Sequence, residues 1–326
     1  MSATSPLADP QPPVVADPWR GSHHFVLARM GQRLTHIGAA IPLSFGCMLL
    51  GSLVLVLPVA LLFPELLSMA FSAELPLLLG AALFAGALIA QFLPIALLIW
   101  VWVTFWERRP FWTLGFEWRG AGRKYLVGFL IGVAMYGLAI GIPALFGYMA
   151  FEQGDPGRQG SAALASVLLV YLGWTIQGPT EEIVCRGWLL QAIGGRYRVW
   201  LGILVSSLIF MILHGLNPNI SPIALLNLFL FGVFTCLYTL YEGGLWGVAA
   251  LHASWNWAQG NLFGIEVSGN QVIGGVVINL QENGPDLITG GAFGTEGGIA
   301  CTAVLLLGIA ICGVLIERRR RVAVSG

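Results

Sequence analysis

The sequence predicts an all-α membrane protein, a polytopic bundle of about eight transmembrane helices with both termini in the cytoplasm. Of its 326 residues, 57% are hydrophobic and 10% are charged, whereas a soluble domain usually carries about 25% charged residues. Apolar runs close to the roughly 20 residues that a spanning helix needs recur along the chain. Apart from Arg158, the basic residues lie in the terminal segments and in alternate connections between these runs.

The elements follow from this length criterion. We expect residues 1–34 to be a disordered cytosolic tail, because the first 19 are rich in Pro and Ala and lack the apolar core of a signal peptide. Residues 35–160 hold three helices, residues 161–260 the candidate catalytic core, and residues 261–326 a loop, the last helix and a basic tail. The expected spans are 37–63, 77–105, 125–150, 161–179, 199–214, 221–241, 244–259 and 297–316.

The charge distribution predicts the orientation. With eight spans and a cytoplasmic N-terminus, the opposite side of the membrane holds eight acidic residues but Arg158 as its one basic residue. This is the excess of cytoplasmic Lys and Arg that multi-pass proteins show. The basic residues expected in the cytoplasm are Arg20, Arg29, Arg33, Arg108, Arg109, Arg119, Arg123, Lys124, Arg186, Arg196, Arg198 and Arg318–Arg321.

Two connections differ from short turns. Residues 107–124 alternate aromatic and basic side chains, a pattern typical of a segment that lies on the inner leaflet. Residues 260–296 are long, rich in glycine and free of Lys and Arg. We expect an irregular extracytoplasmic loop there, which is either a linker or a lid over the site.

Three charges close to the fourth apolar run form the first candidate site. Glu181, Glu182 and Arg186 lie within six residues, and ionisable residues at membrane depth are costly and usually functional. Arg186 follows Glu182 by four residues, so the two can pair on one helical face. Glu181 has no such cation, and we expect its carboxylate to hold water or a proton. The alternative is a helix end at the interface with solvated charges.

Further polar residues occur in the following spans. Phe210 precedes His214 by one turn, Asn227 lies within the sixth span, and His252 and Asn256 are four apart, so the last two share a helical face. A carboxylate can act as general base on water, imidazoles can bind zinc, and an amide can stabilise an oxyanion. These are the components of a peptide hydrolase, although neither HExxH nor GxSxG is present.

The ordered motifs EExxxR (Glu181, Glu182, Arg186), FxxxH (Phe210, His214) and HxxxN (His252, Asn256) resemble those of the CPBP family of intramembrane proteases. That family includes the CAAX prenyl endopeptidase Rce1 and the bacterial Abi proteins. The resemblance covers residues 165–260 and implies an eight-helix fold whose site lies in a membrane-embedded cavity open toward the cytosol.

The resemblance also implies roles for the residues. Glu181 and His214 would activate a water, His252 and Asn256 would shape an oxyanion pocket or assist a metal, and Glu182 with Arg186 would maintain the architecture. Zinc held by His214, His252 and Glu181, and a metal-free water activated by the glutamate, both remain open.

One difficulty is the separation of Glu181 from His214. Glu181 falls at the cytoplasmic end of the fourth span, and His214 falls at the far end of the fifth. A straight 16-residue helix would separate them by about 24 Å. We expect residues 180–195 to dip back into the membrane as a re-entrant helix, which would bring Glu181 to within about 10 Å of His214.

The function favoured by the sequence is an intramembrane endopeptidase in a bacterial cell membrane. Its expected partners are a membrane-associated protein or peptide substrate and the lipid bilayer, with no nucleic acid. A non-enzymatic scaffold or bacteriocin-immunity protein that keeps the fold is the alternative. A proton-coupled transporter is a weaker one, because no inverted repeats with matched broken spans are visible.

Overall fold

The computed structural model describes residues 21–72 and 74–325. It is helical almost throughout, which confirms the all-α polytopic membrane bundle. The long helices are α2 (Ile37–Leu62), α4 (Leu77–Val101), α5 (Ala121–Leu145), α6 (Leu164–Glu182), α9 (Pro222–Glu242) and α12 (Ile299–Ser325). The shorter helices are α1 (His23–Ala28), α3 (Pro64–Ala70), α7 (Leu190–Arg196), α8 (Val199–Leu213), α10 (Trp246–Trp257) and α11 (Asp286–Thr289).

The remaining elements are short. π-Helical turns occur at η1 (Trp102–Trp106), η5 (Ile183–Leu189) and η6 (Ala258–Leu262). The antiparallel strands β1 (Met149–Phe151) and β2 (Leu280–Glu282) form a two-stranded ribbon. The 3₁₀ turns are η2 (Phe111–Leu114), η3 (Pro156–Arg158), η4 (Gly160–Ala163), η7 (Gly291–Phe293) and η8 (Thr295–Gly297).

Among the described residues, six helices are long and apolar enough to cross a membrane. They coincide with the first, second, third, fourth, sixth and eighth expected spans. The fifth and seventh expected spans are the shorter helices α8, with 15 residues, and α10, with 12 residues. Six of the expected spans are therefore helices long and apolar enough to cross a membrane, while the count of eight and a crossing by α8 and α10 stay predictions.

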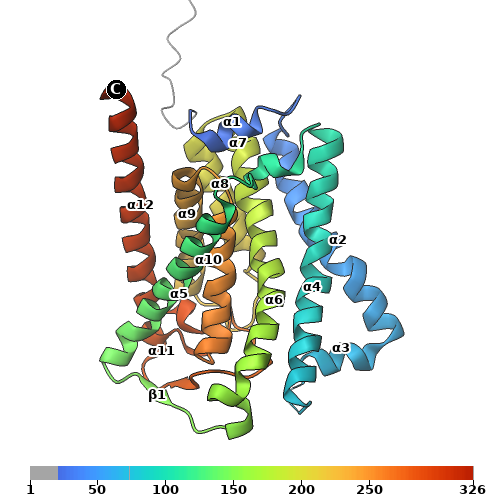
Figure 1. Ribbon diagram of the computed structural model, residues 1–326, viewed down its shortest axis with the longest axis vertical. Coiled ribbons are helices and arrows are strands. Elements are labelled where there is room, and N and C mark those ends of the chain that lie inside the picture. Colours follow the sequence, from blue (N-terminus) through green and yellow to red (C-terminus); the bar gives the residue numbers. More distant parts are fainter. Residues whose placement is uncertain (1–20, 73, 326) are drawn as a thin grey trace, which may run out of the picture.

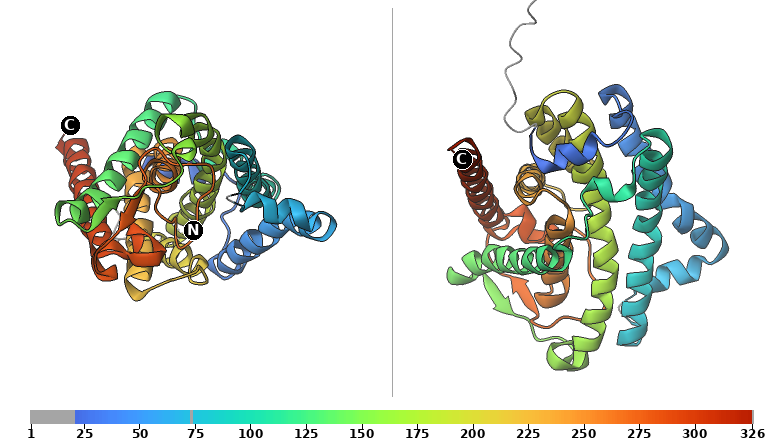
Figure 2. Two further views of the ribbon diagram at one scale, coloured as in Figure 1. Left: turned by 90° about the horizontal axis from the view of Figure 1, so that it is seen from below. Right: turned by 45° about the horizontal axis from the view of Figure 1, so that its top comes forward.

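The elements gather at two ends of the molecule (Figure 1). We call one end the basic end: it holds α1, α7, residues 107–120 and the C-terminal turns of α12. The other is the loop end, which holds β1, β2, α11 and the rest of residues 258–298. Between them α10 packs against α5 and α6, and α6 packs against α4. Helices α2 and α3 project from one side of the bundle (Figure 2).

Close backbone contact fixes the position of α10. A Cβ atom at Gly128 of α5 would overlap the carbonyl oxygen of Gly247, and one at Gly132 would overlap the hydroxyl of Ser254. Both glycines lie on the face of α5 that meets α10. Small residues at such contacts let helix backbones approach closely in a bundle where van der Waals packing drives association.

Part of the expected N-terminal tail forms a helix. The expectation of disorder for residues 1–34 is therefore wrong for the helix His23–Ala28. Residues 1–20 lie outside the described part of the chain. Helix α1 follows directly, and its side chains His24, Phe25 and Leu27 are buried. Phe25 packs in a hydrophobic cluster with Leu190 and Val199 of α7 and α8. This burial of apolar surface explains why a six-residue helix is held in place.

The segment 107–124 is divided between interior and surface. Glu107, Arg109 and Thr113 are fully buried, whereas the Trp118 side chain is 81% exposed. The alternation of residue types therefore reflects two environments: an internal polar cluster and an exposed aromatic face. Its location on the inner leaflet stays a prediction.

Candidate active site

The Glu181 carboxylate lies inside the bundle with one oxygen held and the other free. Its Oε1 accepts a hydrogen bond of 2.8 Å from Nε2 of Gln177, one helical turn earlier on α6. The Gln177 Oε1 in turn accepts a 2.8 Å hydrogen bond from Asn256 on α10. The Oε2 atom of Glu181 is buried and has no hydrogen-bond partner among the described residues. The alternative of solvated charges at a helix end is therefore wrong.

The two histidines direct the same ring atom at this free oxygen. Nε2 of His214 and Nε2 of His252 are each 3.8 Å from Glu181 Oε2. The Nδ1 of His214 is 2.8 Å from the carbonyl oxygen of Phe210, and the Nδ1 of His252 is 2.7 Å from Glu182 Oε1. Both of these partners accept, so each neutral imidazole donates from Nδ1 and presents the lone pair of Nε2 to Glu181.

Glu182 and Arg186 form the expected pair one turn apart. Arg186 Nη1 donates to Glu182 Oε1 over 3.2 Å, and neither side chain is exposed. The guanidinium also lies over the Phe210 ring, 4.5 Å from its centroid. Glu182 therefore joins Arg186 to His252 and fixes the orientation of that ring, as outer carboxylates do for functional histidines.

Arg186 lies in a π-helical turn that directly follows Glu182, the last residue of α6. Residues Ile183–Leu189 continue α6 without a break, and insertions of this type are frequent at functional sites. Two carbonyl groups of the turn accept hydrogen bonds from other helices. The Cys185 carbonyl accepts from the Ser206 hydroxyl of α8 at 2.8 Å, and the Arg186 carbonyl accepts from Nε2 of His24 in α1 at 2.9 Å.

The proximity of Glu181 to His214 is confirmed, but the re-entrant helix expected at 180–195 is wrong. The elements η4, α6, η5 and α7 form one continuous helical segment over Gly160–Arg196, 37 residues long. Glu181 thus lies within the helix and not at its end. The chain reverses between Arg196 and Val199, so that α8 returns along α7 and brings His214 back to the level of Glu181.

A cavity of ≈ 580 Å³ adjoins these residues. It is lined by Glu181, His214, His252 and Asn256 and by aromatic and aliphatic side chains of α4, α6, α8 and α9. Residues 267, 268 and 270–273 also line it. The connection 260–296 therefore folds over the cavity, with the geometry of a lid more than of a linker.

This location bears on two expectations. The cavity runs from the carboxylate toward the loop end, whereas the helical segment between Glu182 and the basic end is buried. A cytoplasmic N-terminus puts the loop end outside the cytoplasm. The N-in orientation and the opening of the cavity toward the cytosol both stay predictions.

Two residues were assigned incompletely from the sequence. Gln177 was missed, although it is a polar residue one turn before Glu181 in an apolar run, which is the same signal that selected Asn256. Asn227 was grouped with the site, but its amide donates to the carbonyls of Glu296 and Gly298 and its oxygen accepts from Thr302. It lines the cavity and anchors the loop end, with no hydrogen bond to the carboxylates.

The donors around Glu181 match zinc in type, since two imidazole nitrogens and one carboxylate bind zinc in known hydrolases. The Nδ1 atoms of both histidines also have hydrogen-bond acceptors, a backbone carbonyl for His214 and a carboxylate for His252, as metal-binding histidines usually do. Within residues 21–72 and 74–325, however, no group of three His, Cys, Asp or Glu side chains is placed to hold a metal ion. A metal ligand set of His214, His252 and Glu181 stays a prediction.

Comparison with known proteins supports the motif assignment. Residues 161–258 match the family model described as type II CAAX prenyl endopeptidase Rce1-like. The chain is also 31% identical over 141 residues to an uncharacterized 24.3 kDa protein of Escherichia coli, an alignment that covers 41% of this chain and 61% of that protein. No solved structure matches the chain. The match spans all three motifs on the helices that surround the cavity, so residues 161–258 of this multi-pass membrane protein are similar to the Rce1-like family.

Proposed function

We propose that the chain is an intramembrane endopeptidase of a bacterial membrane, which hydrolyses a peptide bond of a membrane-associated protein or peptide. The observation that carries the proposal is the free Oε2 of Glu181, buried and 3.8 Å from Nε2 of both histidines. Three acceptor atoms so close together favour a water molecule between them, whose two O–H groups donate to Glu181 and to one imidazole. The Rce1-like match supports the same reaction, and the Escherichia coli relative supports the bacterial membrane.

The reaction requires little movement of these groups. Glu181 takes one proton from the water as its oxygen attacks the peptide carbonyl carbon, which forms a tetrahedral intermediate. Asn256 lies beside the same cavity and can donate an amide N–H to the oxyanion, whereas His252, which donates from Nδ1 to Glu182, accepts from the water through Nε2. The C–N bond then breaks, and the proton held by Glu181 passes to the departing amine nitrogen. If zinc is bound, Glu181, His214 and His252 would hold it, and it would lower the pKa of the bound water.

The test compares peptide termini by mass spectrometry in membranes from cells that produce wild type, Glu181→Gln or the control Glu65→Gln. Glu181→Gln keeps the shape of the side chain and removes the base, so termini made by the enzyme should fall by about a hundredfold or more. Glu65 is exposed in α3, and its variant should match wild type.

A scaffold predicts the opposite outcome. If the Glu181→Gln variant gives the same termini as wild type and still rescues the deletion phenotype, hydrolysis at this site is rejected. Whether the site binds zinc is tested by a separate measurement. Elemental analysis of purified wild type and a His214→Ala, His252→Ala double variant should show stoichiometric zinc in the wild type alone if these residues form a metal centre.

A further inference from the structure

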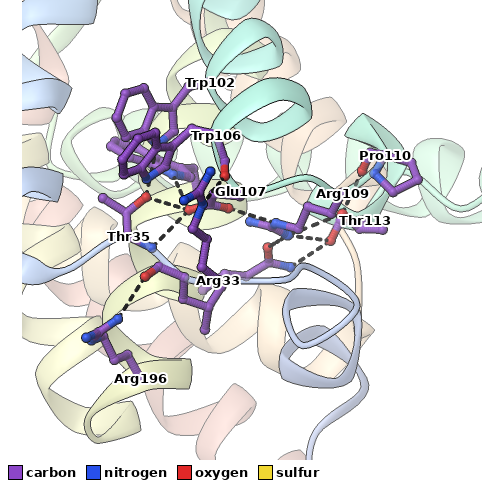
Figure 3. Close-up of polar contacts among 12 residues, drawn as sticks. Arg33, Thr35, Trp102, Trp106, Glu107, Arg109, Pro110, Thr113 and Arg196 are labelled. Carbon is purple, nitrogen blue, oxygen red and sulfur yellow. Dashed lines mark hydrogen bonds and ion pairs between the residues drawn. The ribbon is translucent and has the colours of Figure 1, made fainter.

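Buried polar side chains fill the interior of the basic end (Figure 3). Glu107 accepts hydrogen bonds from Thr35 Oγ1 at 2.7 Å and from Arg109 Nε at 2.8 Å. The indole Nε1 of Trp188 donates to the same carboxylate over 3.1 Å. We call these four residues the Glu107 cluster. It holds the stretch before α2 (residues 29–36) against the stretch after η1 (residues 107–110).

Two exposed arginines lie on this base, one from each stretch. Arg33 donates from Nε to the Trp106 carbonyl, and its guanidinium lies over the Trp106 ring, 4.2 Å from the centroid. Arg108 donates from Nη1 to Oε1 of Gln32 over 3.2 Å. Because Gln32 adjoins Arg33 and Trp106 is two residues before Arg108, the two guanidinium groups belong to one patch. We call Arg33, Trp106 and Arg108 the arginine surface.

The backbone at Arg108 shows that its outward position is imposed by the fold. Its φ angle is +55°, in the left-handed region that is unfavourable for a residue with a Cβ atom. The neighbours Glu107 and Arg109 are both buried and bonded to each other, which leaves the Arg108 side chain outside. An arginine fixed on a rigid base loses less freedom when a ligand binds.

Neither arginine of this surface is neutralised by a carboxylate. Among the ion pairs of residues 21–72 and 74–325, none includes Arg33 or Arg108. The one acidic residue of the two stretches, Glu107, is already paired with Arg109 inside the bundle. The arginine surface therefore presents two uncompensated positive charges, which favour an anionic ligand.

The arginine surface lies next to apolar side chains of the bundle. Phe105 and Trp106 are exposed at the end of η1. Helix α2, and α4 together with η1, are long and apolar enough to cross a membrane, so the arginine surface lies just beyond the ends of two candidate spans. Tryptophan rings in membrane proteins are enriched at the level of the lipid headgroups, which is where lipid phosphates lie.

We propose that the arginine surface binds the headgroup of an anionic phospholipid, whose acyl chains lie along Phe105. The guanidinium groups of Arg33 and Arg108 donate to the phosphate oxygens, which an arginine can bind through two parallel N–H groups. A zwitterionic lipid fits less well, because its ammonium group would approach two cations that no carboxylate balances. The proposal goes beyond hydrolysis at Glu181 and does not depend on it.

Native mass spectrometry of the purified protein, titrated with phosphatidylglycerol, measures the dissociation constant of the bound lipid. Phosphatidylcholine with the same acyl chains should bind more weakly by about tenfold. The double variant Arg33→Gln, Arg108→Gln should weaken the binding of phosphatidylglycerol by about tenfold or more, because each cation near an anionic headgroup contributes a factor of about five. Arg119→Gln removes an exposed arginine of the same end outside the arginine surface, and its affinity should match wild type.

Three results would overturn the proposal. Equal losses in the double variant and in Arg119→Gln would show a diffuse attraction by all the basic residues of this end. Equal affinities of wild type and the double variant would reject the lipid and leave the surface to another anion, such as an acidic segment of a protein. Binding of glycerol 3-phosphate as tight as that of the whole lipid would show a site for free phosphate esters.

The stability of the variants is checked by thermal unfolding without added lipid. All of them should unfold at the wild-type temperature, because the replaced side chains are exposed. If Arg33→Gln lowers that temperature, Arg108→Gln alone decides the result, since the Arg108 side chain bonds to the exposed Gln32 and not to the Glu107 cluster. An unchanged dissociation constant in Arg108→Gln then rejects the proposal, whatever the outcome for hydrolysis at Glu181.

Discussion

At the scale of single residues, the central feature of the site is that the two carboxylate oxygens of Glu181 have different surroundings. Oε1 is fixed by Gln177, which leaves Oε2 directed at the imidazoles. The Gln177 side chain also holds Asn256, so one amide sets the relative position of the proposed base and the proposed oxyanion donor. Gln177 is thus a positioning residue between α6 and α10.

Replacing Gln177 by Leu should lower kcat/KM by about tenfold to a hundredfold. Hydrogen bonds to charged groups contribute about 1.5–3 kcal/mol, and each 1.4 kcal/mol of lost transition-state stabilisation is a factor of about ten in rate. The rate is measured on a peptide that spans a cleavage site found by the comparison of termini. Gln153→Leu, which changes an exposed glutamine that does not line the cavity, should retain most of the activity; equal losses in both variants would rule out the positioning role.

The sequence predicted contacts of this kind only when they were local. The Glu182–Arg186 pair follows from i,i+4 spacing and was expected. The bond from Gln177 to Glu181 has the same spacing but joins an amide to a carboxylate, which the search for charges overlooked. The link between His252 and Glu182 joins residues 70 positions apart, and the order of the motifs along the chain does not determine which side chain meets which.

At the scale of elements, a helical hairpin explains how the motifs converge. The reversal lies between Arg196 and Val199, so Glu181 and His214 are each about 16 residues from its centre. Because both arms of the hairpin rise by the same distance per residue, Glu181 and His214 lie at the same distance from the reversal and therefore face each other. The sequence suggested a helix end at Glu181 because charges usually mark the interface. The helix continues instead, with Glu182 paired to Arg186 and one oxygen of Glu181 held by Gln177 inside the bundle.

Contact between α5 and α10 supports the same site, because α10 carries His252 and Asn256. Gly128→Ala should destabilise the protein by about 1–3 kcal/mol, the usual cost of overpacking, because its Cβ would overlap the Gly247 carbonyl. It should also lower activity by displacing α10. Thermal unfolding in detergent measures the first effect. Gly137→Ala is the matched control on the same helix, since no atom lies within 4 Å of its Cβ; if both variants unfold alike, close packing does not position α10.

At the scale of the whole molecule, the N-terminal helix completes the closure of the basic end. His24 bonds to the Arg186 carbonyl through Nε2, and its Nδ1 lies 3.5 Å from the Gln191 amide nitrogen, which can donate to it. A charged imidazole has no lone pair to accept that bond. Burial accordingly lowers the pKa of His24 from 6.5 to about 4, and the nearby Arg109 charge acts in the same direction. Docking of α1 therefore requires the neutral imidazole, a dependence that the composition of residues 1–34 did not reveal.

The sign of the resulting pH dependence follows from proton binding. Between pH 6.5 and 4 the unfolded chain binds a proton at His24 that the folded chain does not, so stability rises with pH across this window. The full contribution, about 3 kcal/mol from the size of the shift, is present above pH 6.5 and is lost as the pH falls toward 4. The midpoint of thermal unfolding of wild type should be constant down to about pH 6.5 and then decrease.

Two variants separate this effect from general acid sensitivity. His24→Gln keeps an amide donor for the Arg186 carbonyl but cannot titrate, so its unfolding midpoint should decrease less between pH 6.5 and 4 than that of wild type. His36→Asn removes an exposed histidine at the start of α2 and keeps a side chain able to cap the helix. It should follow the wild-type curve. Identical curves for His24→Gln and wild type would show that α1 is held by its apolar contacts alone, with Phe25 and Leu27 as the residues that attach it to the bundle.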